Sequence, residues 1–146
     1  MIEFHEIKDI PTLMKWRREV IRHVFGEEPD PELMEANKEY YLSHIASGAH
    51  LAVVALAEGI EAGCGAICFS EELPSPDNKS GRCAYLMNIY VREEYRTRGI
   101  GHRIVECLVD KARRRNCGKI YLETTEEGRP VYASLGFREM KDMMKL

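Results

Sequence analysis

The chain lacks the features typical of a membrane protein, a secreted protein or a nucleic-acid-binding protein. None of its apolar runs approaches the ~20 residues needed to span a bilayer, and its N-terminus lacks the basic-then-apolar pattern of a secretion signal. The net charge is −3, so no basic surface for nucleic acid is expected. We therefore expect a cytoplasmic protein without a membrane or nucleic-acid partner.

The sequence also lacks organised cysteines. Its cysteines are odd in number and scattered, and no two stand in C-x-x-C spacing, so neither a disulfide framework nor a structural zinc site is expected. We expect them to be small buried side chains, and no metal. The five are Cys64, Cys68, Cys83, Cys107 and Cys117.

Length and composition are those of an ordinary globular domain. The chain has 146 residues, 45% of them hydrophobic and 31% charged, which predicts one domain over residues 1–146. Hydrophobic periodicity predicts strands at 2–7, 51–56, 63–69, 82–91, 119–124 and 137–146, and helices at 10–25, 32–45, 99–115 and 129–135. This order predicts a mixed α/β sheet with helices packed on it.

Two further details concern the stretch 70–81 and the strand at 82–91. The stretch 70–81 holds two prolines and many turn-forming residues, so it is expected to be a surface loop. Strict alternation along 82–91 would place Tyr85, Met87, Ile89 and Val91 on one side of the strand.

The segment Arg96-Thr97-Arg98-Gly99-Ile100-Gly101 joins the strand at 82–91 to the helix at 99–115. The first turn of a helix leaves backbone N–H groups without partners and carries partial positive charge. Gly99 and Gly101 have no Cβ, so a diphosphate could approach these amides, and Arg96 and Arg98 add positive charge. Dinucleotide and P-loop motifs do not fit, because their glycine and lysine positions are missing. A tight turn into a helix is the alternative.

This segment resembles the R/Q-x-x-G-x-G/A loop of the GCN5-related N-acetyltransferases (GNAT family). Further along, Val131-Tyr132-Ala133-Ser134-Leu135-Gly136-Phe137 resembles the family's second signature, a tyrosine five residues before the phenylalanine of L-G-F. The resemblance is most specific over residues 82–138. It implies a mixed, mostly antiparallel central sheet with a splayed strand pair, flanked by about four helices.

The resemblance also implies an activity and a cosubstrate. The protein would be an acetyl-CoA-dependent N-acetyltransferase that transfers the acetyl group directly to a primary amine. Relatives bind acetyl-CoA through the loop residues Arg96, Thr97, Arg98, Gly99, Ile100 and Gly101. The strand before the loop lends backbone groups to the pantetheine arm, which here implicates Asn88, Ile89, Tyr90 and Val91.

Tyr132 is the predicted catalytic residue. The resemblance implies that its hydroxyl protonates the thiolate that leaves the tetrahedral intermediate; a core tyrosine is the alternative. No general base is assigned, and Glu123, His23 and His44 are the candidates. One departure from the family pattern is that Thr125 and Gly128 stand where many relatives have asparagine and alanine.

Several questions stay open at this stage. A non-catalytic acyl-CoA-binding sensor or regulatory module is an alternative function, and dimerisation is common among relatives. The acceptor is unidentified, and so is any use of acyl groups other than acetyl. Acidic residues near the expected acceptor site would attract a cationic substrate or would simply keep the loops hydrated: Glu27, Glu28, Asp30, Glu71 and Glu72.

Overall fold

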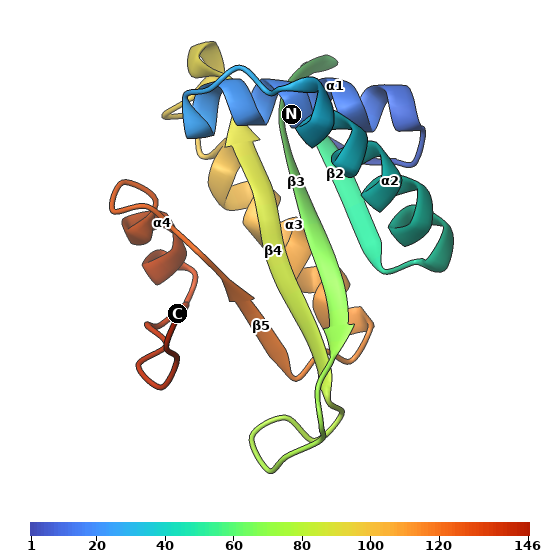
Figure 1. Ribbon diagram of the computed structural model, residues 1–146. Helices are drawn as coiled ribbons and strands as arrows, with labels where there is room; N and C mark the ends of the chain where they lie inside the picture. Colours follow the sequence, from blue (N-terminus) through green and yellow to red (C-terminus); the bar gives the residue numbers. More distant parts are fainter.

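The computed structural model describes residues 1–146 as a five-stranded sheet with helices on both faces (Figure 1). The strands are β1 (Ile2–Ile7), β2 (His50–Ala57), β3 (Ile60–Glu71), β4 (Arg82–Val91) and β5 (Lys119–Leu122). The helices are α1 (Ile10–Val20), continued by a π-helical turn (Ile21–Phe25), α2 (Pro31–Ser47), α3 (Ile100–Arg114) and α4 (Arg129–Ser134). No helix is long and apolar enough to cross a membrane.

Neighbouring strands of the sheet follow each other in chain order, from β1 to β5. The pairs from β1 to β4 are antiparallel, whereas β4 and β5 are parallel. The parallel pair is short, because it joins only Cys83–Leu86 to Lys119–Leu122. Beyond it β4 continues to Val91, while the chain after β5 leads away to α4 (Figure 1). The mixed sheet and the splayed strand pair are therefore confirmed.

Each face of the sheet carries its own hydrophobic core. On one face Ile100, Ile104 and Leu108 of α3 are buried against Ile67 and Leu86 of the sheet. On the other face α1 and α2 contribute a second buried cluster, which includes Leu13, Trp16, Val20 and Tyr41. The two helical layers lie in front of and behind the sheet in Figure 1. Together they fix the position of β4, which lies between the two cores.

Local capping chemistry sets the ends of α1 and α2. Asp9 Oδ2 accepts a hydrogen bond from Thr12 N at 3.0 Å, and Asp30 Oδ1 accepts one from Leu33 N at 2.8 Å. A proline stands in the first turn of each helix, where its missing N–H costs no hydrogen bond. Gly48 ends α2 in the left-handed conformation, with φ of 79°.

The strict alternation predicted for β4 is wrong. Asn88 has a φ of 55°, and the register between β3 and β4 shifts opposite it. Such a bulge adds one residue to the strand and reverses the side on which later residues lie. Met87 and Tyr90 therefore pack against the α1/α2 core, and Ile89 and Val91 pack against the α3 core.

The final strand predicted for 137–146 is also wrong. Residues 138–146 form turns and irregular structure, and the side chains of Met143 and Met144 are exposed. A strand there would need a neighbouring edge, and β5 is only four residues long. The stretch 70–81 is a connecting segment as predicted, although β3 extends into it as far as Glu71.

Candidate active site

The loop before α3 presents a row of unpaired backbone donors. The N–H groups of residues 97–102 donate to no protein acceptor, whereas Arg96 N and Arg103 N on either side donate to Glu93 O and Gly99 O. Thr97 and Gly99 have φ values of 65° and 76°, which turn the chain sharply into the helix. Six consecutive donors at a helix N-terminus, together with the helix dipole, favour an anion.

The two arginines of this segment, Arg96 and Arg98, have different surroundings. Arg96 folds back, so that its Nε donates to Val91 O at 2.9 Å and its guanidinium lies over the ring of Tyr90. The guanidinium of Arg98 lies over the ring of Tyr95. Neither forms an ion pair with an acidic residue of the chain. Their positive charge is therefore available to a bound anion.

The other loop positions have distinct surroundings. Ile100 is buried in the α3 core, so its side chain anchors the helix start while its N–H stays unpaired. A Cβ on Gly99 would meet no atom within 4 Å, and one on Gly101 would meet only Val91 Cγ2, at 3.7 Å. The space over these two residues is open in the protein.

The strand β4 brings its last residues beside this loop. Residues 87–91 lie beyond the pairing with β5, so one edge of this segment has no neighbouring strand. At Asn88 the side-chain Oδ1 accepts a hydrogen bond from Arg17 Nη1 at 2.8 Å, and the backbone carbonyl accepts one from Cys64 Sγ at 3.3 Å. The bulge thus lies close to the point where β4 and β5 separate.

Tyr132 lies on α4, half-buried, with its ring edge-on to that of Phe137. Its hydroxyl has no hydrogen-bond partner in the protein. Burial raises the pKa of Tyr132 above its ordinary value. The phenol is therefore neutral at physiological pH, and its O–H is available as a donor.

The departure from the family pattern at Gly128 has a steric reason. A Cβ there would lie 2.7 Å from Thr124 Oγ1 and 3.2 Å from Tyr132 Cε2. Thr125, at the position of the usual asparagine, accepts the Gly128 N–H on its Oγ1 at 3.3 Å. Glycine at this position lets the Tyr132 ring pack closely against the start of α4.

The three candidate bases have different environments. Glu123 Oε1 accepts a hydrogen bond from Tyr85 Oη at 3.0 Å, which links β4 to the chain just after β5. His23 stacks on the ring of Tyr90. His44 stacks on Tyr40 with ring centroids 4.0 Å apart and contacts the Tyr40 carbonyl. The structure does not bring these three side chains together.

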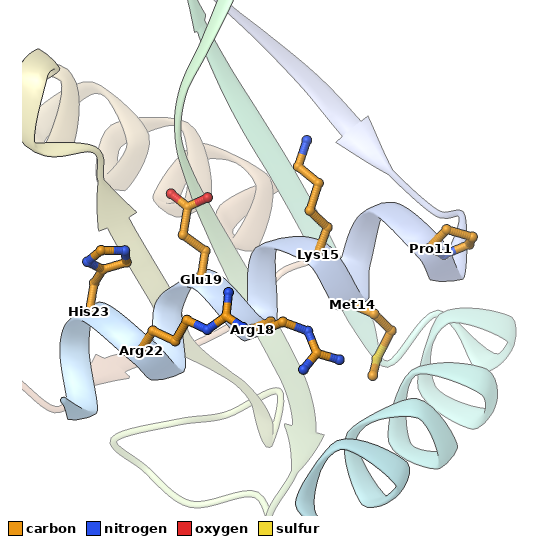
Figure 2. A pocket seen from close by; sticks show the side chains of 7 residues that line it. All are labelled: Pro11, Met14, Lys15, Arg18, Glu19, Arg22 and His23. Atoms are coloured by element: carbon orange, nitrogen blue, oxygen red, sulfur yellow. The ribbon is translucent and has the colours of Figure 1, made fainter. Parts of the chain in front are cut away.

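Two hollows lie on the α1 side of the molecule. A cavity of about 160 Å³ lies where α1, α2 and β4 meet, and Arg17, Asn37, Tyr40, His50 and Asn88 are among its lining residues. The larger hollow, about 490 Å³, is lined only by residues of α1 and the π-helical turn (Figure 2). Only the smaller one includes a residue of β4, so it is the one that adjoins the splayed strands.

Sequence reasoning missed Arg17, Asn37 and His50. They come from two helices and the first residue of β2, and no motif connects them. The acidic residues proposed as an attraction for a cationic acceptor are largely engaged elsewhere. Glu28 pairs with Arg22, Glu72 accepts from Asn78 and Lys119, and Asp30 caps α2.

Comparison with known proteins decides which family has this geometry. The sequence pattern described as the Acetyltransferase (GNAT) family matches residues 10–137. The chain belongs to the GNAT acetyltransferase family. It is an N-acetyltransferase, and its cosubstrate is acetyl-CoA. The resemblance to this family is thus confirmed.

Individual GNAT relatives cover much of the chain. It is 34% identical over 122 residues to glucosamine 6-phosphate N-acetyltransferase 1 of Oryza sativa subsp. japonica, which covers 81% of this chain and 72% of that protein. N-alpha-acetyltransferase 30 of Saccharomyces cerevisiae is 36% identical over 64 residues, 42% of this chain and 36% of that protein. Among solved structures, a predicted acetyltransferase with acetyl-CoA from Clostridium acetobutylicum has a TM-score of 0.88 and 28% identity. The match covers 100% of this chain and 96% of the other.

Proposed function

We propose that the loop at 96–101 and the free edge of β4 together hold acetyl-CoA for direct transfer to a primary amine. The observation that carries this proposal is the run of six unpaired N–H groups over residues 97–102. They can donate to the pyrophosphate while Arg96 and Arg98 offset its charge. The open space over Gly99 and Gly101 lets the phosphates approach the backbone.

The pantetheine arm is proposed to lie along residues 88–91. In this segment β4 has no neighbour on the β5 side, so a ligand amide can pair with its backbone as an added strand would. The side chains of Ile89 and Tyr90 point into opposite cores. Recognition by this strand would therefore depend on backbone groups and on the bulge at Asn88.

Tyr132 is proposed as the general acid. The neutral amine attacks the thioester carbonyl carbon, and the tetrahedral intermediate collapses with cleavage of the C–S bond. The sulfur leaves as a thiolate that takes the Tyr132 proton, the former amine nitrogen loses a proton to water, and the tyrosinate regains its proton from solvent. A phenol with a raised pKa and no protein partner for its hydroxyl suits this role. The step needs no metal and no covalent enzyme intermediate.

Several further expectations stay predictions. The relative from Oryza sativa is named for glucosamine 6-phosphate, so a small amino sugar phosphate is one acceptor to test first.

Five free thiols fit a reducing cytoplasm. A single domain over 1–146 and a homodimer also stay predictions; light scattering would test the dimer.

The experiment is an amine screen that follows release of the coenzyme A thiol. The panel contains glucosamine 6-phosphate, glucosamine, spermidine, free amino acids and a peptide with a free N-terminus. Amine-dependent thiol release with formation of the N-acetyl product supports direct transfer. Saturable acetyl-CoA binding without release on any amine would instead support the sensor alternative.

A further inference from the structure

The cavity between α1, α2 and β4 contains an arginine whose position is fixed by two neutral amides. Arg17 Nε donates to Asn37 Oδ1 at 2.9 Å, and its Nη1 donates to Asn88 Oδ1 at 2.8 Å. Asn37 in turn donates to Leu33 O at 2.8 Å, which orients its amide. The guanidinium is therefore held in place by residues of α2 and β4, without a carboxylate.

The charge of Arg17 is not balanced within the chain. It forms no ion pair, whereas the nearby cations do: Arg92 pairs with Glu19, and Arg22 pairs with Glu28. A guanidinium has five N–H donors, and only two of those on Arg17 have side-chain acceptors. The remaining donors suit a carboxylate or phosphate, which an arginine binds in a forked geometry.

A second, independent observation comes from the same cavity. His50 lines it and is only 5% exposed, yet its Nε2 has no hydrogen-bond partner. Its Nδ1 is engaged with the Tyr40 hydroxyl at 2.8 Å. Buried polar atoms in proteins are usually paired, so this Nε2 is available to a polar group that enters the cavity.

We infer that this cavity is a subsite for an anionic group of the acceptor, a phosphate or a carboxylate held chiefly by Arg17. A volume of about 160 Å³ equals that of only a few waters, so the cavity holds one end of the acceptor. Asn88 both lines the cavity and belongs to the β4 segment assigned to acetyl-CoA. An acceptor anchored here would extend its amine toward the thioester, so this inference rests on the proposed function.

The larger hollow along α1 is a poor alternative, although it is lined by more basic residues. Figure 2 shows that its side chains all come from one helical face. Lys15 is paired with Glu61, and Arg22 is held by Glu28 through two hydrogen bonds. Arg18 lines this hollow and is one position from Arg17 in sequence, which makes it a matched control.

The test measures acetylation of paired acceptors by wild type, Arg17→Gln and Arg18→Gln. One pair is glucosamine 6-phosphate with glucosamine; the other is 6-aminohexanoate with its amide. The pairs distinguish phosphate from carboxylate. For the preferred anionic acceptor, Arg17→Gln should raise KM about 10- to 100-fold, since charged hydrogen bonds are lost. The KM of the neutral partner should rise much less than that of the anionic acceptor, and Arg18→Gln should behave as wild type.

Two further measurements separate the possible failures. Arg17→Lys keeps the charge but loses the forked donor geometry, so its KM for the anionic acceptor should lie between those of wild type and Arg17→Gln. Thermal melting checks that each variant is folded. The subsite would be overturned if wild type acetylates neither anionic acceptor better than its neutral partner. It would also be overturned if Arg17→Gln raises the KM of both members of a pair equally. If wild type does not bind acetyl-CoA at all, the proposed function is overturned instead.

Discussion

Replacing Tyr132 with phenylalanine isolates one hydroxyl group. The ring packs edge-on against Phe137 and close to Gly128, and phenylalanine keeps both contacts. The hydroxyl has no partner in the protein, so its removal leaves no other polar group unsatisfied. We therefore expect the free energy of unfolding to change by less than about 1 kcal/mol.

The expected effect on catalysis is much larger. Proton transfer by a positioned general acid contributes about 10²- to 10⁴-fold, which corresponds to roughly 3–5 kcal/mol of barrier. Burial raises the pKa of Tyr132, so the phenol keeps its proton at every pH below about 10, the ordinary tyrosine value. The factor by which kcat falls should therefore be the same at every pH between about 6.5 and 9, because the side chain does not titrate in this range.

The assay is steady-state release of coenzyme A thiol across this pH range, with acetyl-CoA affinity measured separately by calorimetry. We expect Tyr132→Phe to bind acetyl-CoA as wild type does, with kcat lower by at least about 100-fold. Unchanged kcat at all pH values would refute the acid role of Tyr132. A fall in kcat caused by unfolding would show as a lower melting temperature.

Two further predictions concern stability. Glu19→Ala should cost about 2 kcal/mol, because Arg92 loses two hydrogen bonds of 2.9 Å while it stays partly buried. Since Arg92 lowers the pKa of Glu19, this stabilisation is complete above pH ~4.5 and is lost as pH falls through the lowered pKa. Urea unfolding of wild type and variant at pH 7 and pH 3 measures the stabilisation and its pH dependence. The same difference in unfolding free energy at the two pH values would contradict the pH dependence. Gly65→Ala would place a Cβ 2.6 Å from Ile104 Cγ2 and 3.0 Å from Leu108 Cδ1, so it should destabilise by about 1–3 kcal/mol; an unchanged melting temperature would contradict this.

Local signals explain what the sequence could predict. The bounds of β4 and α3 depend on hydrophobic periodicity within a few residues. The loop proposed to hold acetyl-CoA could also be located in the sequence, because its glycines and arginines stand close together and two family motifs lie in the expected order. The second motif singled out Tyr132 as the candidate acid.

Long-range contacts explain what the sequence could not predict. The bulge at Asn88 has no clear local signal beyond the tolerance of asparagine for positive φ, yet it reverses the sides of Ile89 and Val91. Arg17 contacts Asn88 across 71 positions, so only the fold reveals its partners. The tail after Phe137 has strand-like composition, but no neighbouring strand is available to pair with it.

Titration of acetyl-CoA into the protein, followed by calorimetry, tests the central claim most directly. The decisive variant is Gly101→Glu, because its Cβ meets only Val91 Cγ2 at 3.7 Å and a carboxylate in the first turn of a helix is favourable. It should stay folded but place negative charge where the pyrophosphate is proposed to bind. Arg113→Gln, exposed near the other end of α3, makes the same change in net charge and serves as the control. We predict micromolar binding, about −8 kcal/mol, in wild type and Arg113→Gln and none in Gly101→Glu; equal binding by all three would show that the α3 N-terminus does not hold the cosubstrate.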